Sequence, residues 1–94
     1  MIKIAFAGFR HGHIYGLYKL AQSNPDIEIV GAYEADAVAR EAAVKNLGVS
    51  FNYDNYDNML NDKNIDVIAI GDYFGKRGSL AIAALKAGKH VYAD

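Results

Sequence analysis

Short apolar runs alternate with helical patterns along the whole chain. Runs rich in isoleucine, valine and aromatic residues lie at Ile2–Ala7, Ile27–Tyr33, 49–52, 66–70 and His90–Ala93. Several of these runs are apolar at consecutive positions, which is typical of strands in a parallel sheet that is covered on both faces. Strands that alternate with helices form βαβ units with right-handed crossovers. The sequence therefore predicts an α/β fold, a doubly wound parallel sheet with three layers in a single domain.

The first and last helical patterns are the clearest. The first repeats apolar residues at i, i+3, i+4 and i+7, which are Ile14, Leu17, Tyr18 and Ala21. Pro25 follows this stripe, and proline disfavours helical geometry in the residue before it. The last pattern covers 76–87 and ends at Gly88, and its inner stripe is expected to be Leu80, Ala83, Ala84 and Ala87.

Two further helices are expected in the middle of the chain. The second helix covers 36–47 and is expected to direct inward Val38, Ala42 and Leu47, with Gly48 as a left-handed C-terminal cap. The third is short, because segment 51–64 is biased toward Asn, Asp and Tyr and has only Met59 and Leu60 as strong apolar anchors. With these helices the expected sheet is Rossmann-like, with strand order 3-2-1-4-5.

Composition narrows the classes of partner. The 94 residues carry a formal net charge of −1, so the chain has no bulk attraction to nucleic acid or to an anionic membrane. No apolar run approaches the roughly 20 residues of a membrane span. Arg10, His11 and His13 interrupt the region where a secretory signal would have its apolar core. The absence of cysteine fits a reducing compartment, so a cytoplasmic location is expected.

A glycine turn between the first strand and the first helix is the strongest candidate for a binding site. It consists of Gly8, Phe9, Arg10, His11, Gly12 and His13. A helix that begins here points unpaired N–H groups and the positive end of its dipole at one place, which suits a phosphate. The basic side chains of the turn are able to add hydrogen bonds to phosphate oxygens. Only Gly8 matches the pattern G-x-G-x-x-G, so a turn without a ligand remains the alternative.

An acidic residue, Glu34, ends the second expected strand. A carboxylate at this place is able to accept both hydroxyls of an adenosine ribose. The alternative is a solvated charge that caps the next helix, but Asp36 suits that role better because it directly precedes the apolar period. The loop 71–77, after the fourth expected strand, lies at the same end of the sheet and adds the candidates Gly71, Asp72, Tyr73 and Arg77.

The His-x-His pair at His11 and His13 raises the possibility of a metal site. Such a site needs three or four ligands. His90 is the only other histidine, and no Asp or Glu is an obvious fourth ligand. A metal is therefore not expected.

The chain resembles the N-terminal nucleotide-binding part of the Gfo/Idh/MocA oxidoreductases over essentially its whole length. The segment 64–94, "NIDVIAIG…LAIAALKAGKHVYAD", is similar to the family's I-D-x-V-x-I-x-T-P … A-x-x-A-L-x-A-G-K-H-V-x-x-E-K-P. The stretch "VGAYEAD" resembles V-A-V-x-D-x-D and places the family's ribose-binding acid on Glu34. Tyr56, Met59 and Leu60 resemble the tyrosine and leucines of the family's short third helix.

Departures from the family pattern shape what the resemblance implies. The family's Thr-Pro falls near Asp72 and Tyr73, and a histidine that often follows falls on Arg77. Asp94 stands at the glutamate of E-K-P, and the lysine beside the nicotinamide would come next. The resemblance therefore implies that residues 1–94 are an incomplete dinucleotide-binding domain, without a catalytic residue and without the C-terminal substrate domain.

Two classes of function remain open. One is the NAD-binding domain of a dehydrogenase that acts on a sugar, a polyol or a related hydroxyl compound, with NAD preferred to NADP because of Glu34. The other is a non-enzymatic Rossmann module that senses a nucleotide or mediates self-association. An edge strand at His90–Ala93 would favour a homo-oligomer in either case.

Overall fold

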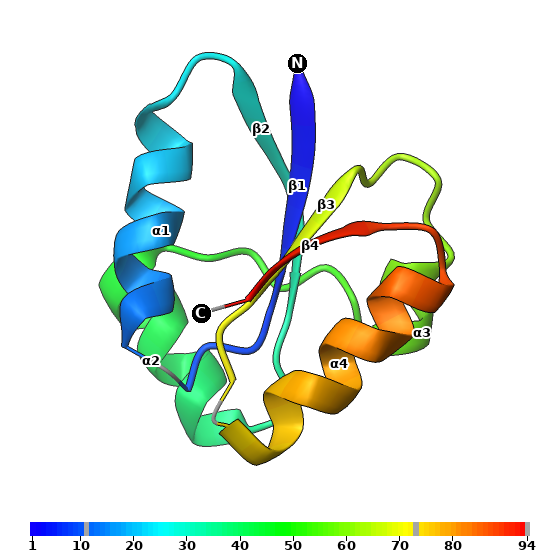
Figure 1. Ribbon diagram of the computed structural model, residues 1–94. Coiled ribbons are helices and arrows are strands. Elements are labelled where there is room, and N and C mark those ends of the chain that lie inside the picture. The colour runs from blue at the N-terminus through cyan, green and yellow to red at the C-terminus, as the bar shows by residue number, and fades with distance from the viewer. Residues whose placement is uncertain (11, 73, 94) are drawn as a thin grey trace.

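The described residues form four strands and four helices, one strand fewer than the sequence predicts. The computed structural model describes residues 1–10, 12–72 and 74–93 (Figure 1). Its elements are β1 (Ile2–Ala7), α1 (His13–Ser23), β2 (Ile27–Tyr33), α2 (Ala37–Leu47), α3 (Tyr56–Leu60), β3 (Val67–Ile70), α4 (Phe74–Lys86) and β4 (His90–Ala93).

The four strands form one parallel sheet with the order β2-β1-β3-β4. This is the predicted order without the strand expected at 49–52, which was wrong: the segment has no strand structure. The side chain of Asn52 explains the difference. Its amide nitrogen donates to the Val30 carbonyl at 3.1 Å, and its carbonyl oxygen accepts from the Ala32 N–H at 3.0 Å. One side chain thus satisfies the outer edge of β2 where a short strand was expected.

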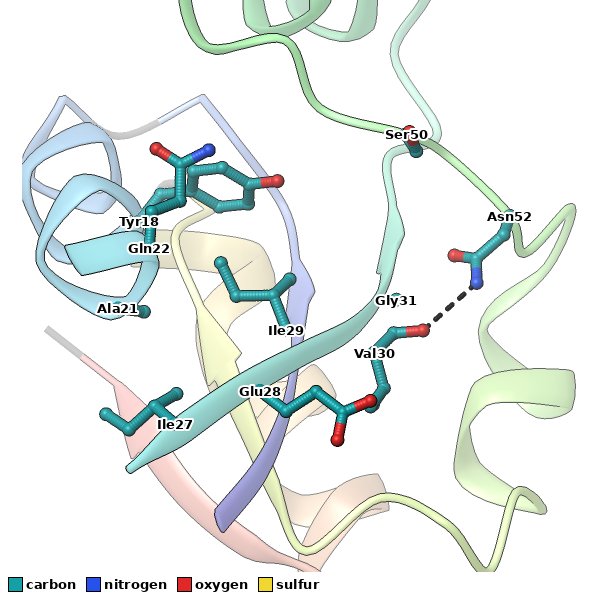
Figure 2. A pocket seen from close by; sticks show the side chains of 10 residues that line it. All are labelled: Tyr18, Ala21, Gln22, Ile27, Glu28, Ile29, Val30, Gly31, Ser50 and Asn52. Atoms are coloured by element: carbon teal, nitrogen blue, oxygen red, sulfur yellow. Dashed lines mark hydrogen bonds between the residues drawn. The ribbon is translucent and has the colours of Figure 1, made fainter. Parts of the chain in front are cut away.

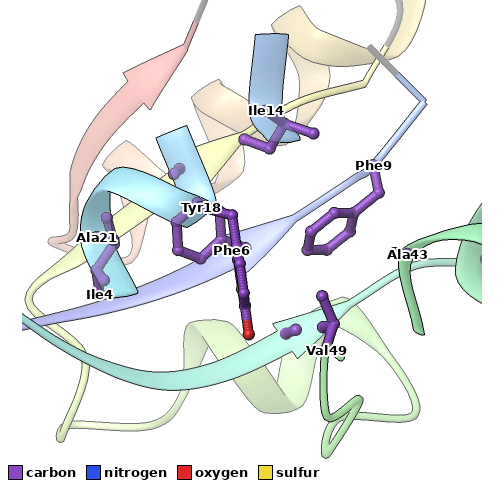
Figure 3. Packing of buried hydrophobic residues seen from close by; sticks show 10 residues of the cluster. Ile4, Phe6, Phe9, Ile14, Tyr18, Ala21, Ala43 and Val49 are labelled. Atoms are coloured by element: carbon purple, nitrogen blue, oxygen red, sulfur yellow. The ribbon is translucent and has the colours of Figure 1, made fainter. Parts of the chain in front are cut away.

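Helices cover both faces of the sheet (Figure 1). On the face of α1 and α2, an aromatic cluster fills the core, and Phe6 meets Tyr18 with 4.9 Å between ring centroids (Figure 3). On the face of α3 and α4, the core contains Met59, Ile68 and Ile70. Met59 is fully buried and Leu60 is half-buried, so the anchors expected for the short third helix are confirmed.

The caps of α2 agree with the sequence, and its inward face agrees in part. The Asp36 carboxylate accepts from the Ala39 N–H at 2.9 Å, and Gly48 has φ 69°. Val38, which was expected inside, is 76% exposed, whereas Ala43 is fully buried. Of the other two expected residues, Ala42 is half-buried and Leu47 packs partly buried against the core, so the prediction was wrong for Val38 alone. Ala87, which was also expected inside, directly follows α4 and is exposed.

Candidate functional site

The turn after β1 depends on a glycine at its first position. Gly8 has φ 89°, in the left-handed region that residues with a side chain rarely adopt. A Cβ atom at Gly8 would lie 3.0 Å from both the Cβ and the backbone nitrogen of Asp72. The Gly8 N–H donates to the Tyr33 carbonyl at 3.0 Å. The turn is therefore packed against the ends of both neighbouring strands, β2 and β3.

Gly71 allows the end of β3 to approach α1 closely. A Cβ atom at Gly71 would lie 2.4 Å from the Cβ of Ile14 and 2.8 Å from the Gly8 carbonyl oxygen. Gly71 is therefore a packing glycine, which fixes the start of α1 against the sheet.

The N-terminus of α1 has the features of an anion site. Gly12 is its N-cap, so no side chain caps the helix there, and the first turn contains no acidic residue. His13 is the first helical residue and is exposed. The neighbouring Phe9 contributes differently, because its ring is buried in the aromatic cluster and only its backbone faces the strand ends. His11, expected beside these residues, lies outside the described residues.

Glu34 contacts the turn directly, but with its carboxylate turned inward. Oε1 accepts from the Phe9 N–H at 2.6 Å, and Oε2 accepts from the Asp36 N–H at 2.8 Å. The side chain is only 1% exposed. The structure therefore places Glu34 at the end of β2 as expected, in an arrangement where its oxygens bind the protein's own amides.

Arg10 lies between two buried carboxylates. Its Nε is 3.5 Å from Oδ1 of Asp72 and 3.9 Å from Oε2 of Glu34, and its side chain is 26% exposed. Asp72 is 5% exposed and follows β3. Three expected site residues from three different loops thus meet at the carboxyl ends of the strands.

Two basic residues near the site did not follow from the sequence patterns. Arg40 is exposed on α2, and its Nη1 donates to the Glu34 carbonyl at 3.0 Å. Lys76 lines a small crevice together with Arg10 and Asp72. Its neighbour Arg77, which was the expected candidate, is half-buried in the first turn of α4. Tyr73 lies outside the described residues.

Cavities lie on both sides of the turn. A groove of about 450 Å³ separates the start of α1 from α2 and is lined by Arg10, Gly12, Tyr15 and Asp36. The crevice, of about 40 Å³, lies on the other side and reaches Tyr33 and Lys76. The groove has a size that is usual for sites that hold small organic molecules. Arg10 lines both spaces.

A larger groove, about 590 Å³, lies elsewhere, along the outer side of β2 (Figure 2). Tyr18 and Gln22 of α1 form one wall, and Ser50 and Asn52 form the other. Burial raises the pKa of the Tyr18 phenol. None of the expected site residues lines this groove, so size alone does not identify the functional end of the sheet.

The described part of the chain contains neither a cluster of metal-ligating side chains nor a membrane-spanning helix. Within those residues, no group of three His, Cys, Asp or Glu side chains is placed to hold a metal ion. In the same residues, no helix is long and apolar enough to cross a bilayer.

The combination of a glycine turn, an uncapped helix start and an acid at the end of β2 agrees with sequence comparison. Residues 2–94 match the family described as "Oxidoreductase family, NAD-binding Rossmann fold", the Gfo/Idh/MocA family. The chain belongs to this family. Inositol 2-dehydrogenase of Salmonella typhimurium is 28% identical over 79 residues, which are 83% of this chain and 24% of that protein.

Solved structures of other proteins share the Gfo/Idh/MocA fold of this chain. An NAD-binding protein from Listeria innocua has a TM-score of 0.81 and 30% identity, over 98% of this chain and 26% of its own. Myo-inositol 2-dehydrogenase from Lactobacillus plantarum has a TM-score of 0.72 and 28% identity, over 98% of this chain and 27% of its own. This chain thus spans about a quarter of the length of these relatives.

Proposed function

We propose that the chain binds NAD at the carboxyl ends of its strands, as the cofactor domain of a dehydrogenase. The observation that carries this proposal is the direct contact between the acid that ends β2 and the turn that follows β1, through the Phe9 N–H and Glu34 Oε1. A dinucleotide needs both elements together, because the turn meets its phosphates and the acid meets its adenosine ribose.

Each part of the site has a role in holding the dinucleotide. Gly8 makes the tight turn, Gly12 lets the backbone approach the pyrophosphate, and the N–H groups at the start of α1 donate to it. His13 adds a donor beside them, and the loop that begins at Gly71 and Asp72 borders the adenosine half. Phe9 fixes the turn from inside the core. NAD, when bound, supplies the hydride acceptor.

The proposed substrate of the whole enzyme is a sugar, a polyol or a related hydroxyl compound. Inositol dehydrogenases among the relatives support this class. We assign none of the residues described at the strand ends to binding the substrate or moving its proton. The absence of cysteine in the sequence supports a reducing, cytoplasmic setting.

A second candidate is a module that senses a nucleotide without catalysis. The observation in its favour is that Arg10 and His13 stand where the fingerprint has glycines, and that Glu34 is engaged by the protein itself. A module of this kind would bind adenine nucleotides as well as it binds NAD, because it has no use for the nicotinamide half. Calorimetric titrations of the chain with NAD and with ADP distinguish the two candidates.

We expect NAD to bind more tightly than NADP. A 2′-phosphate beside the Glu34 carboxylate would place two anions together. Of the nearby cations, Arg10 already pairs with Glu34 and Asp72, and Arg40 donates to the Glu34 main chain. Glu34→Ala should weaken NAD binding about tenfold or more, at about 1.4 kcal/mol per decade, and leave NADP binding unchanged or improved. Calorimetric titration of both cofactors measures the two dissociation constants.

Two further variants make this measurement specific. Glu34→Gln keeps an oxygen acceptor for the turn while it removes the charge, so it separates loss of folding from loss of recognition. Glu28→Ala removes an exposed charge from the same strand, away from the strand end, and should leave both affinities unchanged. Equal affinities for wild type and both Glu34 variants would remove Glu34 from the site.

A further inference from the structure

Arg10 links two carboxylates that come from different strand ends. The Glu34 and Asp72 side chains are 1% and 7% exposed, and the Arg10 Nε lies within 4 Å of both. A buried carboxylate is unfavourable unless it is paired and hydrogen-bonded. The guanidinium therefore stabilises both acids in their buried positions, and the two Glu34 oxygens accept backbone N–H groups in addition.

The inward position of Glu34 conflicts with the binding of a ribose. The Glu34 oxygens accept from Phe9 and Asp36, and each has a second lone pair that a ribose hydroxyl could use only if it could reach the oxygen. At 1% exposure these oxygens are closed to a ligand. Recognition of the ribose thus requires the carboxylate to turn outward, away from the turn and from Arg10.

Resting on the proposed function, that a dinucleotide binds at this edge, we infer that Arg10 holds the cofactor site closed. It is an internal competitor of the cofactor: its guanidinium keeps Glu34 inward and itself occupies the space between the groove and the crevice, both of which it lines. Arg10 is thus a positioning residue that lowers affinity. Cofactor binding displaces it.

The sign of the expected effect distinguishes this role from a direct one. If Arg10 served as a phosphate ligand, its removal would weaken the binding of an anionic dinucleotide. If it holds the site closed, its removal raises the fraction of molecules with an open site, and the apparent dissociation constant falls by the same factor. A binding-competent state populated at about 10% or less allows a gain of about tenfold.

The test is calorimetric titration of NAD into the wild type, Arg10→Ala and Arg40→Ala. Arg10→Ala should lower the dissociation constant severalfold, up to about tenfold. Arg40→Ala is the matched control, since it removes the same charge from the same strand end but contacts the Glu34 carbonyl and not its carboxylate. It should leave NAD affinity unchanged or reduce it. Arg10→Lys keeps a cation, so its dissociation constant for NAD should lie between those of Arg10→Ala and the wild type.

Hydrogen exchange of the ligand-free protein gives a second readout. The Phe9 N–H should exchange faster in Arg10→Ala, because the Glu34 carboxylate leaves it. The Gly8 N–H, which donates to the Tyr33 carbonyl at 3.0 Å, should exchange as in the wild type and serves as the internal reference.

The outcomes separate the two proposals. NAD binding that is unchanged or weaker in Arg10→Ala, while the wild type binds, overturns the role of Arg10 and leaves the cofactor site in place. The absence of NAD binding in every variant overturns the proposed function and, with it, the closed site. Equal exchange rates of the Phe9 N–H in the wild type and in Arg10→Ala would also overturn the proposal that Arg10 keeps the Glu34 carboxylate inward.

Discussion

Asp62 is the residue whose contacts give the clearest dependence of stability on pH. Its carboxylate accepts from the Tyr53 hydroxyl in a short hydrogen bond and from the Asn64 N–H at 2.8 Å. The Tyr53 hydrogen bond, followed by that from Asn64, lowers the pKa of Asp62 below its ordinary value of 3.8. Burial and then Asp62 raise the pKa of Tyr53 to about 12. The contact therefore moves the pKa values of the two groups in opposite directions, that of Asp62 downward and that of Tyr53 upward.

The two shifts give opposite pH limits to the stability that this pair contributes. Because the pKa of Asp62 is lowered on folding, its contribution is present above pH 3.8 and is lost as the pH falls through the folded value. Because the pKa of Tyr53 is raised, its contribution is present below pH 10.0 and is lost as the pH rises toward about 12. Tyr53→Phe should flatten both limbs of a plot of unfolding free energy against pH and lower stability at neutral pH by about 1 kcal/mol.

Tyr56→Phe is the matched control for this measurement by urea denaturation. Burial alone raises the pKa of Tyr56 to about 12, and its hydroxyl donates to the Leu80 carbonyl at 2.7 Å. Its removal should flatten only the alkaline limb. An acid limb that is the same in wild type and Tyr53→Phe would show that Tyr53 does not set the pKa of Asp62.

At the scale of elements, the approach of α1 to β3 depends on Gly71. An alanine there would place its Cβ 2.4 Å from the Cβ of Ile14, so α1 must shift or the turn at Gly8 must open. Gly71→Ala should destabilise the fold by about 1–3 kcal/mol through overpacking. It should also weaken NAD binding, since it moves the helix start away from the strand ends.

Gly16 provides the comparison within the same helix. A Cβ at Gly16 meets nothing within 4 Å, so Gly16→Ala should stabilise the protein by about 0.5–1 kcal/mol. Urea denaturation of both variants gives the two changes, which are expected to have opposite signs. A neutral Gly71→Ala would mean that the contact between β3 and α1 relaxes freely.

The sequence predicted those elements whose signals are local. Residues 2–34 follow the order strand, glycine turn, helix, strand and acid. This order predicts the places of Gly8 after β1 and Glu34 after β2. The exposure of Val38 in α2 was missed because alanine and valine occupy several faces of this helix, and packing against α1 and the sheet decides between them. Of the residues in α2, only Ala43 is fully buried.

The remaining features arise from contacts between segments that are distant in sequence. The side chain of Asn52 replaces a strand because it meets β2, 20 residues earlier. The inward turn of Glu34 depends on the Phe9 N–H and on Arg10. Residue patterns describe neighbours along one element, so they do not reveal which side chain bridges two loops.

At the scale of the whole molecule, the two edges of the sheet differ. Asn52 covers part of the outer edge of β2, whereas in the described chain β4 is the other terminal strand of the sheet. Tyr92 of β4 is 52% exposed, and α4 beside it exposes Ile82 and Leu85. An open edge with apolar side chains pairs readily with another strand. We therefore expect that two copies of the polypeptide 1–94 associate through β4.

The backbone of β4 is suited to pairing about a two-fold axis. The His90 N–H donates to the Asp66 carbonyl, so alternation along the strand turns the N–H and C=O of Val91 outward. Two antiparallel copies of β4 would then exchange both hydrogen bonds between their Val91 residues, and the sheets would join across the dimer. Such an isologous contact closes on itself and ends at the dimer.

Tyr92→Lys tests this association, because a cation on an edge strand opposes pairing. Light scattering over a range of concentrations should show a dimer for the wild type and a monomer for Tyr92→Lys. Leu20→Lys is the control, since Leu20 is 65% exposed on α1 and distant from β4 in sequence and in the sheet order. It should leave the dimer intact. A wild type that stays monomeric at its highest soluble concentration would contradict the dimer, and a Leu20→Lys monomer would place the contact on α1 instead of β4.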